Sequence, residues 1–247
     1  MTNPWQLYDD ILDLIPAGIR VTDALIGRWA FVRTDVGTGA AMVYTTGPRA
    51  SLAERDVVGR DLRDVAALVK SWDLEQAALG TAAINAALAT EERVAPYETS
   101  MEGETSTFAL NADKFATQKT ATVGHFGAIE RYMEGNDFVV LERHPIGDDL
   151  PDTAAEYLLS DRDEVYITGS TLTNKSLPRL LELCAHTRVV LVGPSAPFAP
   201  EALPACVSVI AGSIVADPDH VHRALSMGGG MGEARPGLRQ FNAPLQF

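Results

Sequence analysis

Five short apolar runs lie in the second half of the chain, and helical patterns separate most of them. They cover residues 121–124, 138–142, 165–168, 189–193 and 207–211. Strands of a parallel sheet are covered by helices on both faces, so they lack the alternation of apolar and polar positions that a half-exposed strand shows. The pattern therefore predicts βαβ units with right-handed crossovers in an open, Rossmann-like α/β domain.

The first half of the chain has a different pattern. Apolar residues at helical spacing predict a helix that begins at Asn3 or Pro4, and a glycine-bearing turn at 35–39 separates two β-type segments. The expected elements after the first helix are strands over 21–34 and 40–46 and helices over 62–72 and 74–88. A hairpin followed by helices predicts a small α+β domain.

The periodicity fades between residues 91 and 115, which predicts a linker or a mobile crossover. We expect two domains, a small α+β domain over 1–112 and the α/β domain over 113–247. Asp217-Pro218 predicts the start of a last helix, since aspartate caps helices and proline suits the first helical position. That helix is expected to end at the glycines 228–230, followed by an irregular tail.

Composition narrows the class of partner. The chain of 247 residues carries 33 acidic and 20 basic residues, a formal net charge of −13, which disfavours nucleic acid and anionic membranes. It has two cysteines, Cys184 and Cys206, without CxxC spacing, as is typical of a reducing compartment. Neither a signal sequence nor a long apolar segment is evident, so we expect a soluble cytoplasmic protein.

Two of the predicted strands end in loops that are rich in hydroxyl, amide and glycine residues. Residues 168–175 follow one strand and residues 193–195 follow the next. The carboxyl edge of a parallel sheet is where such folds bind ligands. We therefore expect ligand contacts from Gly124, Thr168, Gly169, Thr171, Asn174, Gly193 and Ser195. Asn174 is also the expected N-cap of the helix that follows it.

His125 and Glu142 each lie at the carboxyl end of a predicted strand, and consecutive strands are usually neighbours. Together they are candidates for metal ligands or for a general acid/base pair. A structural histidine and a salt bridge from Glu142 to Arg143 or Lys175 are the alternatives. Glu142 follows Gly124 by 18 residues, close to the spacing of dinucleotide-binding folds, but the glycine fingerprint is incomplete, so a nicotinamide or adenosyl cofactor is less favoured.

Several segments carry a family resemblance. Val123-Gly124-His125-Phe126 and the segments 151–159, 167–178, 192–195 and 212–217, with a weaker match at 83–86, resemble the heavy-metal-chelation family of uncharacterised two-domain proteins. The resemblance implies a domain similar to the enolase N-terminal domain, followed by a Rossmann-like domain. It also implies a role in chelating or handling a metal, although the barrel that holds the magnesium of enolases has no counterpart here.

Two functional hypotheses follow. The first is a protein that binds a divalent transition metal or a metal chelate in a cleft between the two domains, at the carboxyl edge of the sheet. The second is an enzyme, a lyase or transferase acting on a small polar metabolite in a metallophore or metal-cofactor pathway, or a nucleotide-cofactor enzyme. The sequence leaves the choice between them open. A small-molecule or metal-chelate ligand is the expected partner, and the apolar tail and acidic body are compatible with a homodimer.

Overall fold

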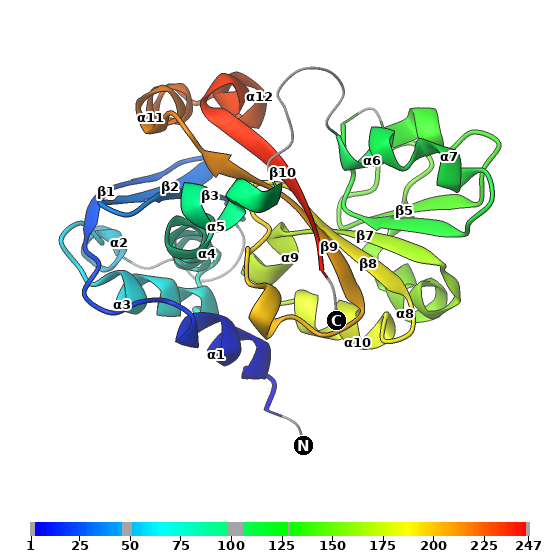
Figure 1. Ribbon diagram of the computed structural model, residues 1–247, viewed down its shortest axis with the longest axis horizontal. Helices are drawn as coiled ribbons and strands as arrows, with labels where there is room; N and C mark the ends of the chain where they lie inside the picture. Colours follow the sequence, from blue (N-terminus) through cyan, green and yellow to red (C-terminus); the bar gives the residue numbers. More distant parts are fainter. Residues whose placement is uncertain (1–2, 46–50, 98–105, 128, 246–247) are drawn as a thin grey trace.

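Two β-sheets form the framework of the computed structural model, which describes residues 3–45, 51–97, 106–127 and 129–245 (Figure 1). The smaller sheet is an antiparallel meander of β1 (Val21–Ile26), β2 (Trp29–Thr34) and β3 (Thr38–Met42). The predicted single strand over 21–34 is wrong, because a turn at Gly27 and Arg28 divides it into β1 and β2.

Helices of the first half lie on one side of this meander (Figure 1). They are α1 (Gln6–Asp13), α2 (Leu52–Arg55), α3 (Leu62–Ala66), η1 (Ala67–Lys70) and α4 (Leu74–Leu88). The Asp73 carboxylate caps α4 by accepting from Glu75 N at 2.9 Å, and nearly every residue of this alanine-rich helix is buried. A Cβ atom at Gly39 would lie 2.1 Å from Ala82 O, so glycine is what allows α4 to lie directly on β3.

The larger sheet has the strand order β10-β9-β8-β7-β4-β5-β6. Its strands are β4 (Thr120–Val123), β5 (Phe138–Glu142), β6 (Leu150–Pro151), β7 (Glu164–Thr168), β8 (Arg188–Val192), β9 (Val207–Val215) and β10 (Leu238–Pro244). Strands β4 to β9 are parallel to their neighbours, as predicted, and β10 is antiparallel to β9. The expected α/β class, with a mostly parallel sheet and a small second sheet, is confirmed.

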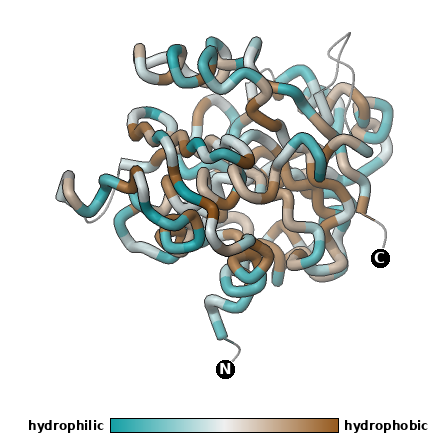
Figure 2. The backbone as a smooth tube through the Cα atoms, turned by 60° about the vertical axis from the view of Figure 1, so that its left-hand side comes forward, coloured by the Kyte–Doolittle hydropathy of each residue, from teal (hydrophilic) through white to brown (hydrophobic). Residues whose placement is uncertain are grey.

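Alternate residues of the central strands face two different cores, which explains the continuous apolar runs. Val165 and Ile167 belong to the core that extends to the meander, whereas Tyr166 and Val190 belong to an aromatic core on the opposite face. Helices and short 3-10 turns cover these faces (Figure 1). Figure 2, which colours the backbone by hydropathy, shows apolar segments gathered in the interior of the molecule. The covering elements are η3 (Ile129–Tyr132), η4 (Asp152–Ala154), α8 (Ala155–Leu158), η5 (Leu159–Asp161), α9 (Ser170–Thr173), α10 (Leu177–Leu183) and η6 (Pro200–Ala202).

The predicted linker contains regular structure on both sides of residues 98–105, which lie outside the described part. Its elements are α5 (Glu91–Val94), η2 (Ala95–Tyr97), α6 (Thr107–Leu110) and α7 (Ala112–Phe115). Phe108 and Phe115 are buried in the aromatic core, so tertiary packing accounts for helices that the local pattern did not predict. The domain boundary between residues 112 and 113 stays a prediction.

The C-terminal segment is ordered, contrary to the expected irregular tail. The last predicted helix is α11 (Pro218–Ser226), capped by Asp217 as expected, and it is followed by α12 (Met231–Ala234), η7 (Arg235–Gly237) and β10. Phe241 of β10 packs on Gly212 of β9, where a Cβ atom would meet its ring at 2.6 Å. Within the described residues, no helix has the length and apolar character needed to cross a bilayer.

Candidate functional site

The loops at the carboxyl ends of β7 and β8 join the larger sheet to the first half of the chain. The Ser195 hydroxyl accepts from Met42 N at 2.9 Å, and Tyr44 OH donates to Ser170 Oγ at 2.9 Å. The Asn174 amide donates to Tyr44 OH at 3.3 Å. The polar side chains in these loops therefore hold the meander against the larger sheet.

Helix α4 contributes a second set of polar contacts to the same junction. The Asn85 amide donates to Pro194 O at 3.0 Å and to Ala40 O at 3.2 Å, so it links β3 to the loop after β8. Thr81 and Thr173 share a hydrogen bond of 2.9 Å between their side-chain oxygens. The Thr81–Thr173 and Asn85–Pro194 hydrogen bonds each join residues that are more than ninety positions apart in the chain. The Asn85–Ala40 bond spans 45 positions.

The other predicted ligand contacts in the loop after β7 also form hydrogen bonds within the chain. Thr171 Oγ1 donates to Thr168 O at 2.6 Å, and Thr168 Oγ1 lies 3.1 Å from Ser170 Oγ. The N-cap of α10 is Ser176 rather than Asn174, and Asn174 Oδ1 accepts from both the amide and the hydroxyl of Ser176. That these residues bind a ligand stays a prediction.

Glycines shape this edge of the sheet. A Cβ atom at Gly169 would lie 2.0 Å from Ala196 N, so glycine lets the loops after β7 and β8 touch. Gly124 and Gly193 have φ values of +108° and +98°, a left-handed conformation that glycine adopts without strain. Gly124 thus turns the chain sharply at the end of β4 and sets the position of His125.

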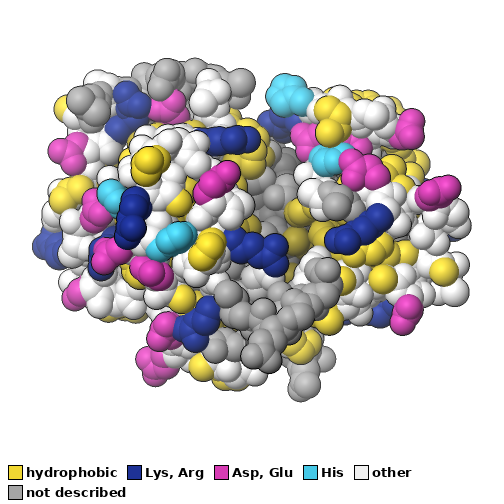
Figure 3. All heavy atoms as spheres, turned by 90° about the horizontal axis from the view of Figure 1, so that it is seen from above, with side chains coloured by type: hydrophobic (Ala, Val, Ile, Leu, Met, Phe, Trp, Pro, Cys, Tyr) yellow, Lys and Arg dark blue, Asp and Glu magenta, His cyan; other side chains and the backbone are white. Residues whose placement is uncertain are grey.

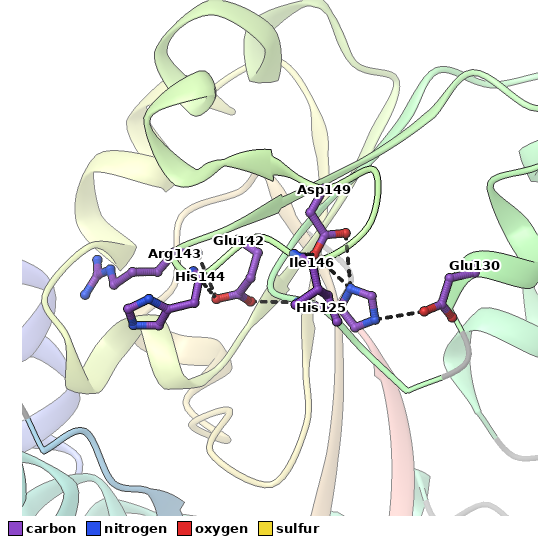
Figure 4. Close-up of polar contacts among 7 residues, drawn as sticks. All are labelled: His125, Glu130, Glu142, Arg143, His144, Ile146 and Asp149. Carbon is purple, nitrogen blue, oxygen red and sulfur yellow. Dashed lines mark hydrogen bonds and ion pairs between the residues drawn. The ribbon is translucent and has the colours of Figure 1, made fainter.

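The His125 imidazole lies between two carboxylates (Figure 4). Its Nδ1 is 3.0 Å from Asp149 Oδ2 and 3.1 Å from Oδ1, and its Nε2 is 3.2 Å from Glu130 Oε1. The Asp149 side chain is 2% exposed, whereas that of Glu130 is 64% exposed. The buried Asp149 carboxylate can accept a hydrogen bond from a proton carried on Nδ1, while the Nε2 atom faces the exposed Glu130 carboxylate.

Glu142 lies next to His125, as the adjacency of β4 and β5 predicts, but it contacts the backbone. Its Oε2 accepts from His125 N at 2.9 Å, and its Oε1 accepts from Arg143 N at 2.8 Å and His144 N at 3.3 Å. Arg143 pairs with Asp152, at 3.1 Å, instead of with Glu142. Glu142 therefore fixes the two loops relative to each other, and the Arg143 and His144 side chains point away from the His125 ring (Figure 4).

A pocket of about 560 Å³ opens beside His125. The charged and titratable side chains that line it are His125, Glu130, Glu134, Asp148 and Asp149. Four carboxylates and one imidazole make this an acidic pocket, suited to a cation. Sequence reasoning missed Glu130 and Asp149, because nothing in the local pattern relates Asp149 to a histidine 24 residues earlier.

Comparisons with known proteins agree with the sequence motifs. The DUF364 family model, described as "Putative heavy-metal chelation", matches residues 106–243, more than half of the chain. This chain belongs to that heavy-metal-chelation family. A second model with the same description, DUF4213, matches residues 8–88, so the predicted resemblance is confirmed in both halves.

Three similar proteins have names or titles that give no function. An uncharacterised protein of Methanocaldococcus jannaschii is 30% identical over 174 residues, and the match spans 66% of this chain and 64% of that protein. A crystal structure from Desulfitobacterium hafniense, of a family member of unknown function, has a TM-score of 0.85 at 29% identity and covers 98% of both chains. One from Pyrococcus horikoshii has a TM-score of 0.78 at 18% identity, covers 98% of this chain and 99% of that one, and is similar in fold.

Metal-ligating side chains do not gather into a large group in the described part of the chain. Among the residues that the structure describes, no group of three or more histidine, cysteine or acidic side chains is arranged to hold a metal ion. Cys184 is buried, burial raises its thiol pKa to about 12, and a protonated thiol is a poor metal ligand. His125 Nε2 and Glu130 Oε1 lie 3.2 Å apart, and both side chains line the acidic pocket.

Proposed function

We propose that this protein binds a divalent transition-metal ion held in a small chelating molecule. His125 Nε2 and Glu130 would be its ligands to the metal. The observation that carries the proposal is the buried Asp149 carboxylate at Nδ1, 3.0 Å away, with Glu130 beside Nε2. Metal-binding histidines usually donate their other ring N–H to a carboxylate or carbonyl group, which fixes the tautomer and makes the ligating nitrogen more basic.

The small number of protein donors favours a chelate over a bare ion. A structural zinc site uses four protein ligands and a catalytic one usually three. The described residues supply an imidazole and a carboxylate at His125 and Glu130, and no larger group. A chelating molecule would provide the other metal ligands, which agrees with the description of the family. Imidazole favours nickel, zinc, copper and iron over magnesium and calcium.

Each neighbouring residue would have a defined role. Asp149 orients the imidazole, and it also accepts from Ile146 N at 3.1 Å, which ties the loop before β6 to the site. Glu134 and Asp148 line the pocket and add negative charge that attracts the cation. Glu142 supports the loops through backbone amides, so we assign the ligand role predicted for Glu142 to Glu130 instead.

Thermal unfolding of tag-free protein with nickel nitrilotriacetate tests the proposal, since this chelate leaves coordination positions open. The wild type should be stabilised, with weaker stabilisation by nickel chloride, and His125→Ala should abolish the effect. Asp149→Asn should weaken binding about 10- to 100-fold. His144→Ala is the matched control, because this exposed histidine lies in the adjacent loop outside the pocket. A wild type that does not respond, or a His125→Ala variant that responds equally, would refute the proposal.

The Asp149–His125 pair also favours a second candidate, an enzyme that uses His125 as a general base toward a small polar metabolite. A carboxylate that orients an imidazole is the arrangement of general-base histidines in hydrolases. If the protein is a lyase or transferase that uses His125 in this way, it would consume one or more members of a panel of small polar metabolites. Mass spectrometry would measure that consumption. His125→Ala would stop consumption, whereas His144→Ala would not, and stabilisation by a metal chelate would not be required.

A further inference from the structure

A second cavity, with the opposite charge, opens at the carboxyl edge of the larger sheet. It has a volume of about 390 Å³ and is lined by the end of β8, the starts of α6, α12 and η7, strands β9 and β10, and the segment after β4. Figure 3, seen from above, shows a hollow in the middle of this face with basic side chains on both sides. This volume corresponds to on the order of ten water molecules, enough for a metabolite.

The charged side chains among the described residues that line this cavity are Arg131 and Arg235. Neither guanidinium has an ion-pair partner within the described part of the chain. Arg131 instead lies over the Tyr132 ring, 5.0 Å from its centroid. In a protein with a net charge of −13, a cavity whose described lining holds two arginines without an ion-pair partner there, and no carboxylate, is a local reversal of charge that attracts anions.

The remaining wall of the cavity is largely aromatic and apolar. Phe108, Phe126 and Phe241 line it, and the rings of Phe108 and Phe126 lie 5.0 Å apart. Ser213 of β9 also lines it, and its buried Oγ has no hydrogen-bond partner among the residues described. Buried hydroxyl groups are normally hydrogen-bonded, so a partner from a bound molecule would account for this one.

We infer that this cavity binds a small organic anion with a flat apolar body. The acidic group would bind Arg131 and Arg235, the flat body would lie against the phenylalanines, and Ser213 Oγ would donate to a polar atom. The site is separate from the metal pocket, because adjacent residues face different hollows: His125 and Glu130 line the acidic pocket, whereas Phe126 and Arg131 line this cavity. The inference therefore does not depend on metal binding.

A nucleoside monophosphate and an aromatic dicarboxylate share this chemistry, and calorimetry can distinguish them. AMP and isophthalate are titrated into full-length protein that has been treated with EDTA and desalted. Adenosine, which lacks the negative charge, and inorganic phosphate, which lacks the flat body, are the control probes. We expect AMP, isophthalate or both to bind, and adenosine and phosphate to bind at least tenfold more weakly. Equal binding of adenosine or of phosphate would overturn the inference, as would the absence of binding by both AMP and isophthalate.

Variants identify where the anion binds. Arg131→Gln/Arg235→Gln should weaken binding about 10- to 100-fold, since charge-assisted hydrogen bonds to both guanidinium groups are lost. Arg28→Gln/Arg223→Gln has the same change in net charge at exposed arginines outside the cavity and should bind normally. Equal losses in both double variants, or none in the first, would contradict the inference.

A variant that fills part of the cavity tests the anion site without changing the charge of the protein. A Cβ atom at Gly127 would meet no atom within 4 Å, and Gly127 lines the cavity, so Gly127→Leu adds an apolar side chain to the cavity wall at a position with room for its Cβ atom. It should abolish AMP or isophthalate binding, leave the melting temperature unchanged and leave stabilisation by nickel nitrilotriacetate intact. Undiminished anion binding in a folded Gly127→Leu protein would overturn the inference.

Discussion

Thr81 of α4 and Thr173 of α9 form a hydrogen bond of 2.9 Å between their Oγ1 atoms, and both side chains are fully buried. Thr81 Oγ1 donates its own proton to Ala77 O at 3.0 Å, so the Thr173 hydroxyl must be the donor between the two threonines. The bond connects the helix that covers the meander to the loop after β7. It is one of the polar contacts that fix the two sheets relative to each other.

This direction of donation predicts unequal effects of removing either hydroxyl. Thr173→Val should lower the free energy of unfolding by about 1 kcal/mol, because Thr81 keeps its bond to Ala77 O. Thr81→Val should cost more, about 2 kcal/mol, because it leaves the buried Thr173 hydroxyl without an acceptor. The double variant should cost less than the sum, which urea unfolding of all four proteins would measure. Additive losses would show that the two hydroxyls do not depend on each other.

For substitutions of Glu142 we predict a loss of stability rather than a loss of metal binding. The Glu142 carboxylate accepts from the amides of His125, Arg143 and His144, and so joins the loops after β4 and β5. Glu142→Ala should lower the free energy of unfolding by about 2 kcal/mol, as expected for losing hydrogen bonds to a charged acceptor. Glu142→Gln retains one acceptor oxygen and should cost less.

Nickel nitrilotriacetate distinguishes this supporting role from the ligand role that the sequence suggested. Glu142→Gln should still be stabilised by the chelate, whereas Glu130→Gln should not. If Glu142→Gln instead lost the response at unchanged stability, Glu142 would be a metal ligand and its assignment to the backbone would be wrong.

The environment of the Lys175 ammonium group predicts that the stability of the protein rises with pH. The backbone of Lys175 is left-handed, with φ of +69°, and its ammonium group donates to Thr173 O at 2.9 Å. Burial lowers its pKa to about 8 from an ordinary 10.5, and the charge of Asp73 opposes this shift. Between these two pKa values the unfolded chain binds more protons than the folded one, so stability contributed at this site rises with pH across that window.

Lys175→Met removes the ammonium group while keeping the Cβ atom and hence the backbone strain. The variant should be more stable than the wild type below pH 8, and the difference should shrink as pH approaches 10.5. Melting temperatures of both proteins from neutral pH to pH 10.5 provide the measurement. A difference that stays constant with pH, or grows, would show that folding does not lower the pKa of Lys175.

Local patterns predicted most elements of the larger sheet because each strand carries its own signal. Val165 and Ile167 face one core and Tyr166 faces the other, so the apolar run marks the strand wherever its neighbours lie. The same reasoning failed for β1 and β2, where apolar residues continue up to a short turn at Gly27 and Arg28. It also failed for β10, whose mixed composition suits an edge strand that packs mainly through Phe241.

Strands β4 and β5 are neighbours, so His125 lies next to Glu142 as predicted. Their adjacency alone does not specify which atoms of the two residues are in contact. The carboxylate contacts the backbone amide of His125, while the imidazole contacts Asp149 and Glu130. Loops before β6 and after β4 supply these groups, and their approach depends on how both loops turn. Sequence reasoning could therefore name His125 as a candidate, but it could not find the carboxylates around it.

The sequence by itself determined most strands of the larger sheet, the overall acidity and the family motifs, because each can be recognised from the residues without knowing which distant segments meet. Only the tertiary structure decided what the polar side chains do. A hydroxyl or imidazole takes the partner that folding brings within about 3 Å, however distant in sequence. Ser195 thus bonds to Met42, 153 residues away, and His125 lies against Asp149. The same folding separated an acidic pocket from a cationic cavity on either side of one loop.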